Sequence, residues 1–358
     1  MNDRSMLVDV VTRILADLCP PEVVREAEVT GWAPRVWDAL AEAGLPWVSI
    51  PEEAGGSGGT LGDAYTILRA AGGFAAPVPL AETGVLGGWL VSRAGMPLPE
   101  GPVTVAVGRP EDAVALVRDG GGWNLTGVVH RVPWARAAKR IVVLVPVEGV
   151  TMVVAVPPGR AEIDHVVNLA GEPRETVRFD GVRLAAEDVA EAPNDVNADA
   201  LRLRGALARA SLMAGALQRV LADTVAYAGE RHQFGRPIGR FQAVQTSLVR
   251  IAEQAECAGL ATEVAIEACE SSWAVFEVAT AKIITGEAAG LVAALSHQVH
   301  GAIGMTKEHH LHTLTRRLWS WRDEFGSEQA WSRRLGRHVA AEGAERLWPL
   351  VATGLVEA

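Results

Sequence analysis

Cysteine is scarce in this sequence of 358 residues, which holds only Cys19, Cys257 and Cys269. Three is an odd number and the spacings match no metal-binding pattern, so neither a disulfide framework nor a zinc site is indicated. A reduced, cytoplasmic compartment fits this usage best. The first residues, MNDRSMLVDVV, lack the long apolar core of a signal peptide. We also expect no membrane span, because we find no run long and apolar enough to cross a bilayer.

An excess of positive charge is also missing. Lys and Arg number 33 against 43 Asp and Glu, which gives a formal net charge of -10. Basic patches are what attract nucleic acids, so this balance argues against a nucleic-acid partner and otherwise indicates only solubility. A hydrophobic content of 49% with 21% charged residues is typical of a soluble globular protein, and the length allows two or three domains.

A metal-binding signature is a further absence, although histidines crowd one stretch of the chain. This stretch contains His297, His300, His309, His310 and His312. The first two form an H-x-x-H pair, but no third ligand follows at a convincing spacing and no H-E-x-x-H is present. We therefore predict no metal site and expect these side chains to serve as helix caps and interface contacts.

Apolar periodicity divides the chain into three blocks. Residues 1–101 show helical spacing interrupted by a Gly-rich loop that lacks both GxGxxG and GKS/T, so no nucleotide loop is indicated. Residues 102–189 are short β-branched runs with a hairpin turn at Gly120–Gly122. Residues 196–358 contain long amphipathic helices, the third from about Trp273 to His297. We predict an α+β multidomain protein: an N-terminal all-α domain, a short middle β-barrel or sandwich, and a C-terminal four-helix bundle.

The stretch Glu230–Gln245, ERHQFGRPIGRFQAVQ, joins two of these helical patterns and is rich in residues that bind flat or phosphorylated groups. Its Gly-Arg-Pro sequence favours a tight turn. Arg231 carries a fork-shaped guanidinium that can hold a phosphate or pyrophosphate. Phe234 can lie against a planar ring, and Gln242 can hydrogen-bond a polar edge. The alternative is an ordinary helix–helix connection with a solvated arginine.

This stretch resembles the signature of acyl-CoA dehydrogenases, Arg-x-Gln-Phe-Gly-x-Pro-Ile followed by Phe-Gln. Further likeness lies in Pro51–Gly59, Ala76–Thr83 and His297–Arg317, and the match is to the actinobacterial subgroup that includes steroid-degrading members. The resemblance implies FAD as cofactor, an oligomer interface on the bundle, and a signature segment that reaches a neighbouring subunit's FAD. It assigns FAD contacts to Arg231, Gln233, Phe234, Gln242, Gln298, Gly301 and Ala302.

The middle block resembles the family more weakly. Trp123–Gly127 and Val132–Ala135 match, but the family's Thr-Glu-Pro-x-x-Gly-Ser-Asp stretch, which touches flavin and substrate, is replaced by VGRPEDAVALVRDGGG. Val132 and Pro133 either line the flavin ring or belong to a structural β-core. Arg69–Gly73 is another departure, because the family usually carries an acidic pair there.

The catalytic base of the family is missing from both of its usual positions. Dehydrogenation of an acyl-CoA needs a carboxylate that removes the α-proton while the β-hydride passes to the flavin. Phe325 stands at one expected position and Gly205 near the other. A shift of register by one residue makes Glu324 the base, with Asp323 as the second candidate. Both are alternatively solvated charges at a helix end.

Two functions follow from the resemblance. In the first, the chain is a FAD-dependent acyl-CoA dehydrogenase that introduces an α,β double bond into an acyl-CoA thioester, as a homodimer or homotetramer. In the second, it is a catalytically silent subunit of a heterotetramer and lends FAD contacts to a partner that supplies the base. The two missing motifs favour the second. A monooxygenase on the same fold has no positive feature in its favour.

Overall fold

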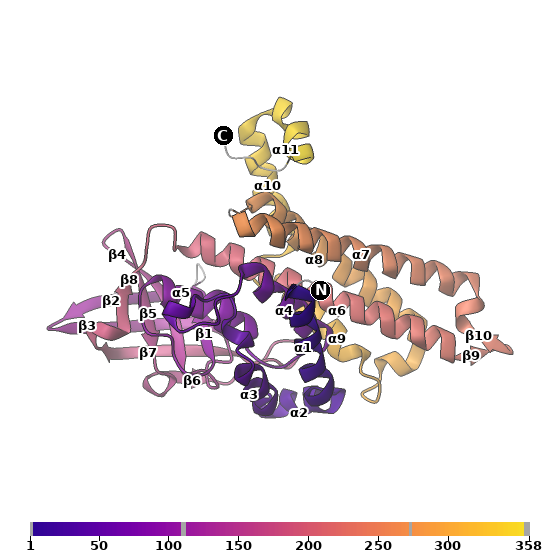
Figure 1. Cartoon of the computed structure of the whole chain (residues 1–358), viewed down its shortest axis with the longest axis horizontal. Coiled ribbons are helices and arrows are strands. Elements are labelled where there is room, and N and C mark those ends of the chain that lie inside the picture. The colour runs from indigo at the N-terminus through magenta and orange to yellow at the C-terminus, as the bar shows by residue number, and fades with distance from the viewer. Residues whose placement is uncertain (1–2, 109–111, 272–273, 354–358) are drawn as a thin grey trace. The chain divides into compact units, whose positions relative to one another are not determined.

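The computed structural model describes residues 3–108, 112–271 and 274–353. Its elements follow the predicted order of helices, strands and helices along the chain (Figure 1). Contacts between Cα atoms divide the chain into two compact units, each drawn from separate parts of the sequence. We call residues 17–64 and 77–205 the β-containing unit, and residues 1–16, 65–76 and 206–358 the helical unit.

Short helices open the β-containing unit. Helix α2 spans Pro21–Thr30 and α3 spans Pro34–Glu42, and each carries proline in its first turn, where a missing N–H costs no hydrogen bond. The 3-10 turns η1 (Leu45–Trp47) and η2 (Glu52–Ala54) follow. Apolar spacing did not separate α2 from the helix before it, because a Pro-Pro pair can end one helix and Pro21 is also the first residue of the next.

A buried π-helical turn, η3 (Glu82–Gly88), continues into α5 (Trp89–Arg93). The hydroxyl of Thr83 donates to the carbonyl oxygen of Val103 at 3.1 Å and accepts from its backbone N–H at 3.0 Å. These two bonds satisfy both backbone groups of the first strand residue. The Ala76–Thr83 stretch therefore has a structural role in joining this turn to the sheet.

Two four-stranded sheets make up the rest of this unit. Strands β1 (Val103–Ala106), β4 (Arg140–Val147), β5 (Val150–Val156) and β8 (Val189–Glu191) form one sheet in the order β1-β4-β5-β8. Strands β2 (Ala113–Asp119), β3 (Gly122–Pro133), β7 (Arg174–Leu184) and β6 (Glu162–Asp164) form the other in the order β2-β3-β7-β6. Only β1 and β4 pair in parallel among these strands. The predicted hairpin turn is confirmed, because Asp119 pairs with Gly122.

Inward-facing residues of both sheets share one hydrophobic core, as in a β-sandwich. Leu125 and Val129 of one sheet and Ile141 and Val154 of the other are fully buried in it. Val132 is also fully buried in this core, which favours the structural reading of that residue over a place beside a flavin ring.

Long helices form the helical unit. They are α1 (Asp3–Leu18), α4 (Leu61–Gly73), α6 (Ala198–Glu230), α7 (Gln242–Ser271), α8 (Val275–His300) and α9 (Leu311–Asp323). A few residues of α1, α4 and α6 belong to the β-containing unit. A small hairpin of β9 (His232–Gln233) and β10 (Arg236–Pro237) joins α6 to α7. Trp273, the expected start of the third long helix, lies outside the described residues, and α8 is described from Val275.

Two glycines set the distance between α4 and α6. A Cβ atom on Gly215 would lie 1.8 Å from the carbonyl oxygen of Arg69, and one on Gly72 would lie 2.0 Å from that of Leu212. No side chain fits at either position, so the two backbones touch directly. Arg69 also pairs with Glu263 of α7 at 2.5 Å. The departure from the family at Arg69–Gly73 thus serves the packing of α4 on the bundle.

Helix α8 corrects one expectation from the sequence. Val275–Met305 is apolar and long enough to cross a membrane by length and composition, with a mean hydropathy of 1.5. The expectation that no such run exists was therefore wrong. Of its most apolar window, 56% is buried inside the structure, and α8 packs against α7, α9 and α10. Burial on several sides explains the composition, because a helix in the middle of a bundle is apolar on most of its faces.

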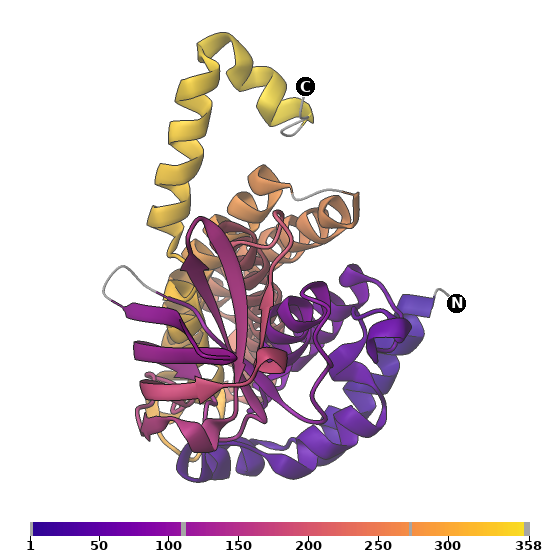
Figure 2. The same ribbon diagram turned by 90° about the vertical axis from the view of Figure 1, so that its left-hand side faces the viewer.

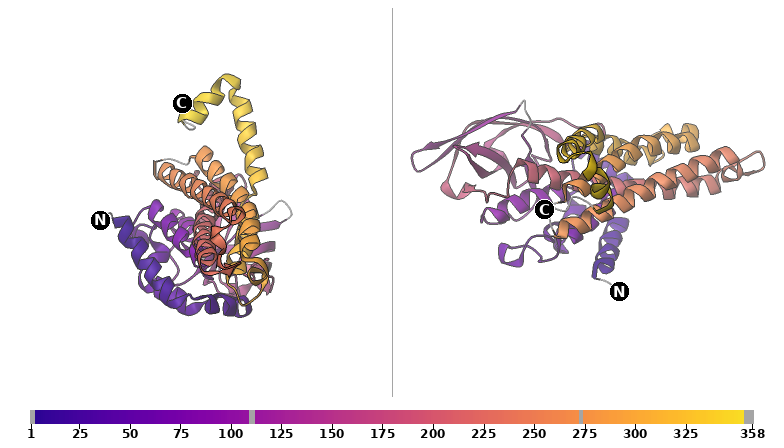
Figure 3. Two further views of the ribbon diagram at one scale, coloured as in Figure 1. Left: turned by 90° about the vertical axis from the view of Figure 1, so that its right-hand side faces the viewer. Right: turned by 90° about the horizontal axis from the view of Figure 1, so that it is seen from above.

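The last two described helices begin on the bundle, where α10 packs on α8, and then project from it (Figures 2 and 3). Helix α10 spans Glu328–Glu342 and is capped by Ser327, whose hydroxyl accepts from the N–H of Ala330 at 3.4 Å. The turn η8 (Ala344–Arg346) leads into α11 (Leu347–Thr353). Trp331 is 2% exposed and anchors the first turn of α10. We call residues 332–353 the C-terminal arm.

Candidate functional site

The signature stretch forms an exposed hairpin. Gln233 pairs with Arg236, and Phe234 and Gly235 make a two-residue turn with φ of 50° and 78°. Two positive φ angles suit a type I′ turn, in which an aromatic residue is strained. Phe234 is 91% exposed, and its ring meets that of Phe241 edge to face at 6.1 Å. The turn therefore holds an aromatic ring in a fixed position in solvent.

Arg231 closes the base of this hairpin through its backbone alone. Its N–H donates to the carbonyl oxygen of Tyr227, and its carbonyl oxygen accepts from the N–H of Ile238, both at 2.8 Å. The residue is exposed, as are Gln233 and Gln242, the first residue of α7. A rigid backbone thus presents one guanidinium and two amides outward.

The second predicted segment lies at the end of α8. Gln298 is in the last turn, Gly301 ends the helix, and Ala302 is in the 3-10 turn η7 (Gly301–Met305), and all three are exposed. Gly301 has φ of 64° and ψ of -144°, a conformation that side chains disfavour, although a Cβ there would meet nothing within 4 Å. The backbone conformation therefore explains why this position is glycine. The space beside Gly301 is open.

Tyr227 brings these two segments to the same end of the helical unit. Its hydroxyl donates to the carbonyl oxygen of His300 at 3.2 Å, and the two rings stack with centroids 4.4 Å apart. Arg231 follows Tyr227 by one helical turn and Gly301 follows His300 directly. Figure 1 shows the β9/β10 hairpin at this end of the bundle.

All five histidines make interactions at this end, and Nδ1 of His312 lies 3.2 Å from the guanidinium of Arg316. The ring of His300 meets that of His309 at 4.7 Å, and His309 stacks on His310 at 4.9 Å. His310 Nε2 lies 2.9 Å from Asp223, and His297 Nε2 lies 2.9 Å from the hydroxyl of Thr315. Within the described part of the chain, no three His, Cys, Asp or Glu side chains are arranged to hold a metal ion.

Burial sets the charge of this cluster. Loss of solvent lowers the pKa of His297, His300 and His309 below the usual value, and repulsion from neighbouring histidines lowers each further. These rings are therefore neutral at neutral pH. Burial raises the pKa of Asp223, but the hydrogen bond from His310 and the charge of Arg219 outweigh it, so that the net shift is downward. The cluster acts as packing beneath the exposed segments.

The turn between α9 and α10 holds both candidate bases. Asp323 is exposed at the end of α9. Glu324 accepts a hydrogen bond from the guanidinium of Arg209 on α6 at 2.5 Å, and the Arg209 side chain is only 2% exposed. This pairing directs the carboxylate toward α6, where the guanidinium occupies one of its oxygens. The role of either residue as a base stays a prediction.

Phe325 occupies the centre of this turn with φ of 56°, followed by Gly326 at 103°. The indole N–H of Trp331 donates to the carbonyl oxygen of Phe325 at 3.0 Å, and the guanidinium of Arg209 lies 5.5 Å from its ring. The side chain from α6 that faces the expected base position is thus a cation. Neither residue was singled out from the sequence: Arg209 meets Glu324 across 115 positions of the chain, and no motif marks Trp331, which lies six residues after Phe325.

Lys282 of α8 is a further residue that the sequence did not indicate. It is fully buried, and its ammonium donates to the carbonyl oxygens of Arg322 at 2.6 Å and Trp321 at 3.3 Å. These carbonyls belong to the last turn of α9, where a cation is favourable. Burial lowers the pKa of Lys282 from 10.5 to about 7, although Glu324 and Glu328 favour the charged form.

The stability of the fold is expected to depend on pH through Lys282. Because its pKa is about 7 in the folded chain and 10.5 in the reference state, the unfolded chain binds more protons between these values. The free energy of unfolding should therefore rise with pH in this window, by up to about 1.4 kcal/mol per pH unit. Urea unfolding of Lys282→Met from pH 7 to 10 should lack this rise, whereas exposed Lys307→Met should keep it. Equal slopes in both variants would contradict the assignment.

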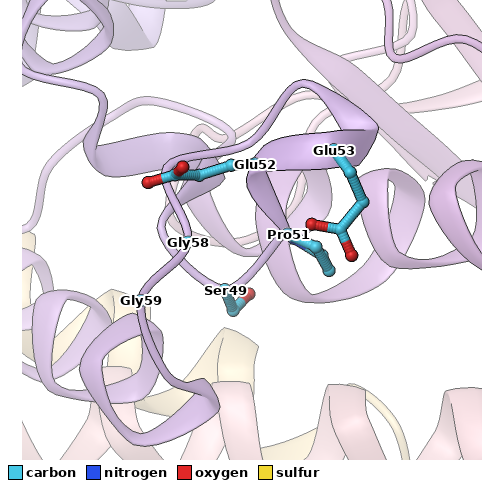
Figure 4. A pocket seen from close by; sticks show the side chains of 6 residues that line it. All are labelled: Ser49, Pro51, Glu52, Glu53, Gly58 and Gly59. Carbon is cyan, nitrogen blue, oxygen red and sulfur yellow. The ribbon is translucent and has the colours of Figure 1, made fainter.

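An open pocket of about 330 Å³ lies in the β-containing unit. It is lined by Ser49, Pro51, Glu52, Glu53, Gly58 and Gly59. The carboxylates of Glu52 and Glu53 are exposed and point in different directions (Figure 4). The pocket therefore lacks converging polar groups, and the Pro51–Gly59 stretch is explained by its turns.

The two helical ends of the chain match the domains of a known enzyme family. Residues 1–97 match the profile of the acyl-CoA dehydrogenase N-terminal domain, and residues 203–340 match that of the C-terminal domain. The chain belongs to the acyl-CoA dehydrogenase family.

Among its relatives is the acyl-CoA dehydrogenase IpdE2 of Mycobacterium tuberculosis, 30% identical over 88% of this chain and 91% of that protein. IpdE2 of Mycolicibacterium smegmatis is 28% identical over 94% of this chain and 99% of that protein. The crystal structure of the ChsE4-ChsE5 complex from Mycobacterium tuberculosis matches with a TM-score of 0.88 at 26% identity, covering 96% of this chain and 99% of that one. The Tcur3481-Tcur3483 steroid enzyme matches with a TM-score of 0.84 at 25% identity, and the match covers 95% of this chain and 98% of that one. The fold predicted from the sequence is confirmed.

Proposed function

We propose that this chain is the non-catalytic subunit of a heteromeric acyl-CoA dehydrogenase and completes an FAD site on a partner subunit. The observation that carries this proposal is the turn at Glu324–Gly326. Its carboxylate is engaged by buried Arg209, and Phe325 stands where the family places its base. A general base must be free to reach a substrate proton, and this arrangement opposes that role.

The exposed segments support a role in holding the cofactor. Arg231 offers paired donors for a phosphate, Phe234 offers a flat face, and Gln233, Gln242 and Gln298 offer amides. FAD, when bound, supplies the acceptor for the hydride. The exposed position of these groups suits a cofactor that is shared with a second chain, because nothing in the hairpin folds back over Arg231.

The relatives support both the assembly and the substrate class. Two of the matched structures are named as pairs of chains, and one of these pairs is named as a steroid enzyme. We propose a heterotetramer that acts in the cytoplasm on the CoA thioester of a bulky, steroid-like acid. The partner would contribute the base and the complete middle domain.

A dehydrogenase that uses Glu324 as its own base is the second candidate. The side chain of Glu324 is 18% exposed and precedes Phe325 directly, so a small change of the turn would bring it to the expected position. In that case the chain would be catalytic as a homo-oligomer.

Flavin absorbance separates the two candidates. We expect the chain purified alone to be colourless, and to become yellow when it is co-expressed with a dehydrogenase subunit that has the family's Glu and Thr-Glu-Pro motifs. In the complex, Glu324→Gln should keep activity within about twofold, whereas Gln at the partner's catalytic Glu should lower it by a factor of about 10²–10⁴. A lone chain that binds FAD and is bleached by an acyl-CoA would instead establish the second candidate.

A further inference from the structure

Three histidine rings pack in series between the end of α8 and the start of α9. The ring of His300, which is 3% exposed, contacts that of His309, and His309 stacks on His310. We call these three residues the histidine stack. Tyr227 on α6 packs against it, parallel to His300 at 4.4 Å and edge to face with His309 at 6.2 Å. Tyr227 lies one helical turn before the signature hairpin and His300 is the last residue of α8, so this packing joins the two exposed segments.

Hydrogen bonds determine where two of these rings carry a proton. Nδ1 of His300 lies 2.8 Å from the carbonyl oxygen of Ser296, which can only accept, so this nitrogen is protonated. Nε2 of the same ring is buried and meets no hydrogen-bond partner among the described residues. Nδ1 of His309 accepts from the N–H of Leu311, the first residue of α9, at 3.1 Å, so it carries no proton. A second proton would therefore bury a charge on His300, or break the bond that His309 makes to α9.

The charges around the stack do not compensate for such a proton. The titratable side chains that face His300 and His309 come from α6, from α8 and from the start of α9, and are Asp223, Tyr227, His297, His310 and His312. Asp223 favours the charged form of both rings, but its carboxylate already contacts His310 at 2.9 Å and Arg219 at 2.8 Å. Burial is the largest effect, and together with repulsion from the other histidines it lowers the pKa of both rings below 6.5.

We propose that the histidine stack is an acid-sensitive switch that holds the signature hairpin and the end of α8 together. While His300 and His309 are neutral the two segments stay in contact, and uptake of a proton by either ring releases the end of α8 from Tyr227. The consequence for the cofactor rests on the proposed function. Separated segments would no longer present Arg231 and Gln298 to the same FAD, so acid would release the flavin.

The direction of the pH dependence follows from proton binding. In the released conformation the rings are solvated and have their usual pKa of 6.5, so this conformation binds more protons than the closed one in acid. Between pH 7.5 and 5.5 the opening equilibrium should therefore rise by up to about tenfold for each ring that takes up a proton.

Hydrogen–deuterium exchange of the full-length, flavin-free chain tests the switch without reference to FAD. After correction for the intrinsic exchange rate, peptides that cover residues 301–311 should exchange up to about 100-fold faster at pH 5.5 than at pH 7.5, because two rings contribute. Peptides of strand β4 in the β-containing unit should not change. A rise of the same size in both regions would mean that acid unfolds the whole chain, and would overturn the proposal.

Three variants separate titration from packing. In His309→Asn the amide oxygen can still accept from the N–H of Leu311 but does not titrate, so the rise in acid should be smaller by up to about tenfold. Tyr227→Phe removes the hydrogen bond to His300 and should speed exchange at every pH without changing the pH dependence. The control is His338→Asn, because His338 is exposed on the C-terminal arm. An equal response to acid in His309→Asn and in the unchanged chain would overturn the switch.

Flavin retention by the assembled complex distinguishes the switch from the proposed function. After gel filtration at pH 5.5, the unchanged complex should have lost its flavin absorbance, and the complex with His309→Asn should keep more of it. If the segments of the flavin-free chain open in acid but the complex keeps its flavin, the switch stands and the FAD contacts of the proposed function are wrong.

Discussion

Arg231→Ala is expected to abolish retention of FAD by the assembled enzyme. The guanidinium stands at the base of a closed hairpin, where its backbone is fixed by two hydrogen bonds and its side chain is exposed. Charge-assisted bonds to a phosphate are strong, and the loss of a paired contact should weaken FAD binding by about 100-fold or more. Absorbance at the flavin bands after gel filtration measures the occupancy.

Arg240→Ala provides the matched control for this prediction. Arg240 is also exposed and lies in the same connection, in the 3-10 turn that precedes α7. It should keep its flavin, and Arg231→Lys should bind FAD with intermediate affinity, because lysine supplies charge without the fork of two donors. If Arg231→Ala stays yellow through gel filtration, the side chain does not hold the cofactor.

Arg209→Met is expected to lower the free energy of unfolding by about 3–5 kcal/mol, near the lower value because Glu324 is partly solvated. The substitution leaves the carboxylate of Glu324 beside a buried apolar group, without the guanidinium that compensates its charge. Urea unfolding at pH 7 measures the change. The double variant Arg209→Met with Glu324→Gln should be less destabilised than the two single changes combined, because the remaining partner is then uncharged.

An exposed ion pair gives the comparison for Arg209. Arg4 and Glu270 lie 2.6 Å apart with side chains 32% and 36% exposed. Arg4→Met should therefore cost only about 0–1 kcal/mol. Equal effects of the two substitutions would mean that Arg209 is not a buried structural charge, and would restore Glu324 as a free carboxylate.

Local sequence was enough to predict the parts of the fold that local chemistry determines. The long helices follow from apolar spacing, and the β2–β3 hairpin follows from its glycines. A tight turn was expected in the signature stretch at Gly-Arg-Pro, but it lies one residue earlier, at Phe234 and Gly235, and Arg236 and Pro237 form β10. Two elements were missed or misjudged because their local sequence fits more than one structure. Helix α2 was missed because proline both ends one helix and begins the next, and α8 was misjudged because burial in a bundle and burial in a membrane favour the same residues.

The candidate site divides in the same way. Arg231 and Gln298 were identified from motifs, but the contact of Tyr227 with His300 that brings their segments together depends on packing between α6 and α8. Arg209 meets Glu324 from a distant helix, and no pattern near either residue predicts the pair. The sequence therefore indicated that the family's base is missing at Phe325. The structure adds that the neighbouring carboxylate, Glu324, is paired with Arg209.

The glycine contact between α4 and α6 has a consequence for biosynthesis. Gly72 emerges from the ribosome long before Gly215, and at typical synthesis rates the delay is on the order of ten seconds. Because the two backbones touch, α4 cannot reach its final packing until α6 has been made. During that interval the side of α4 around Gly72 lacks the native surface that covers it in the finished protein.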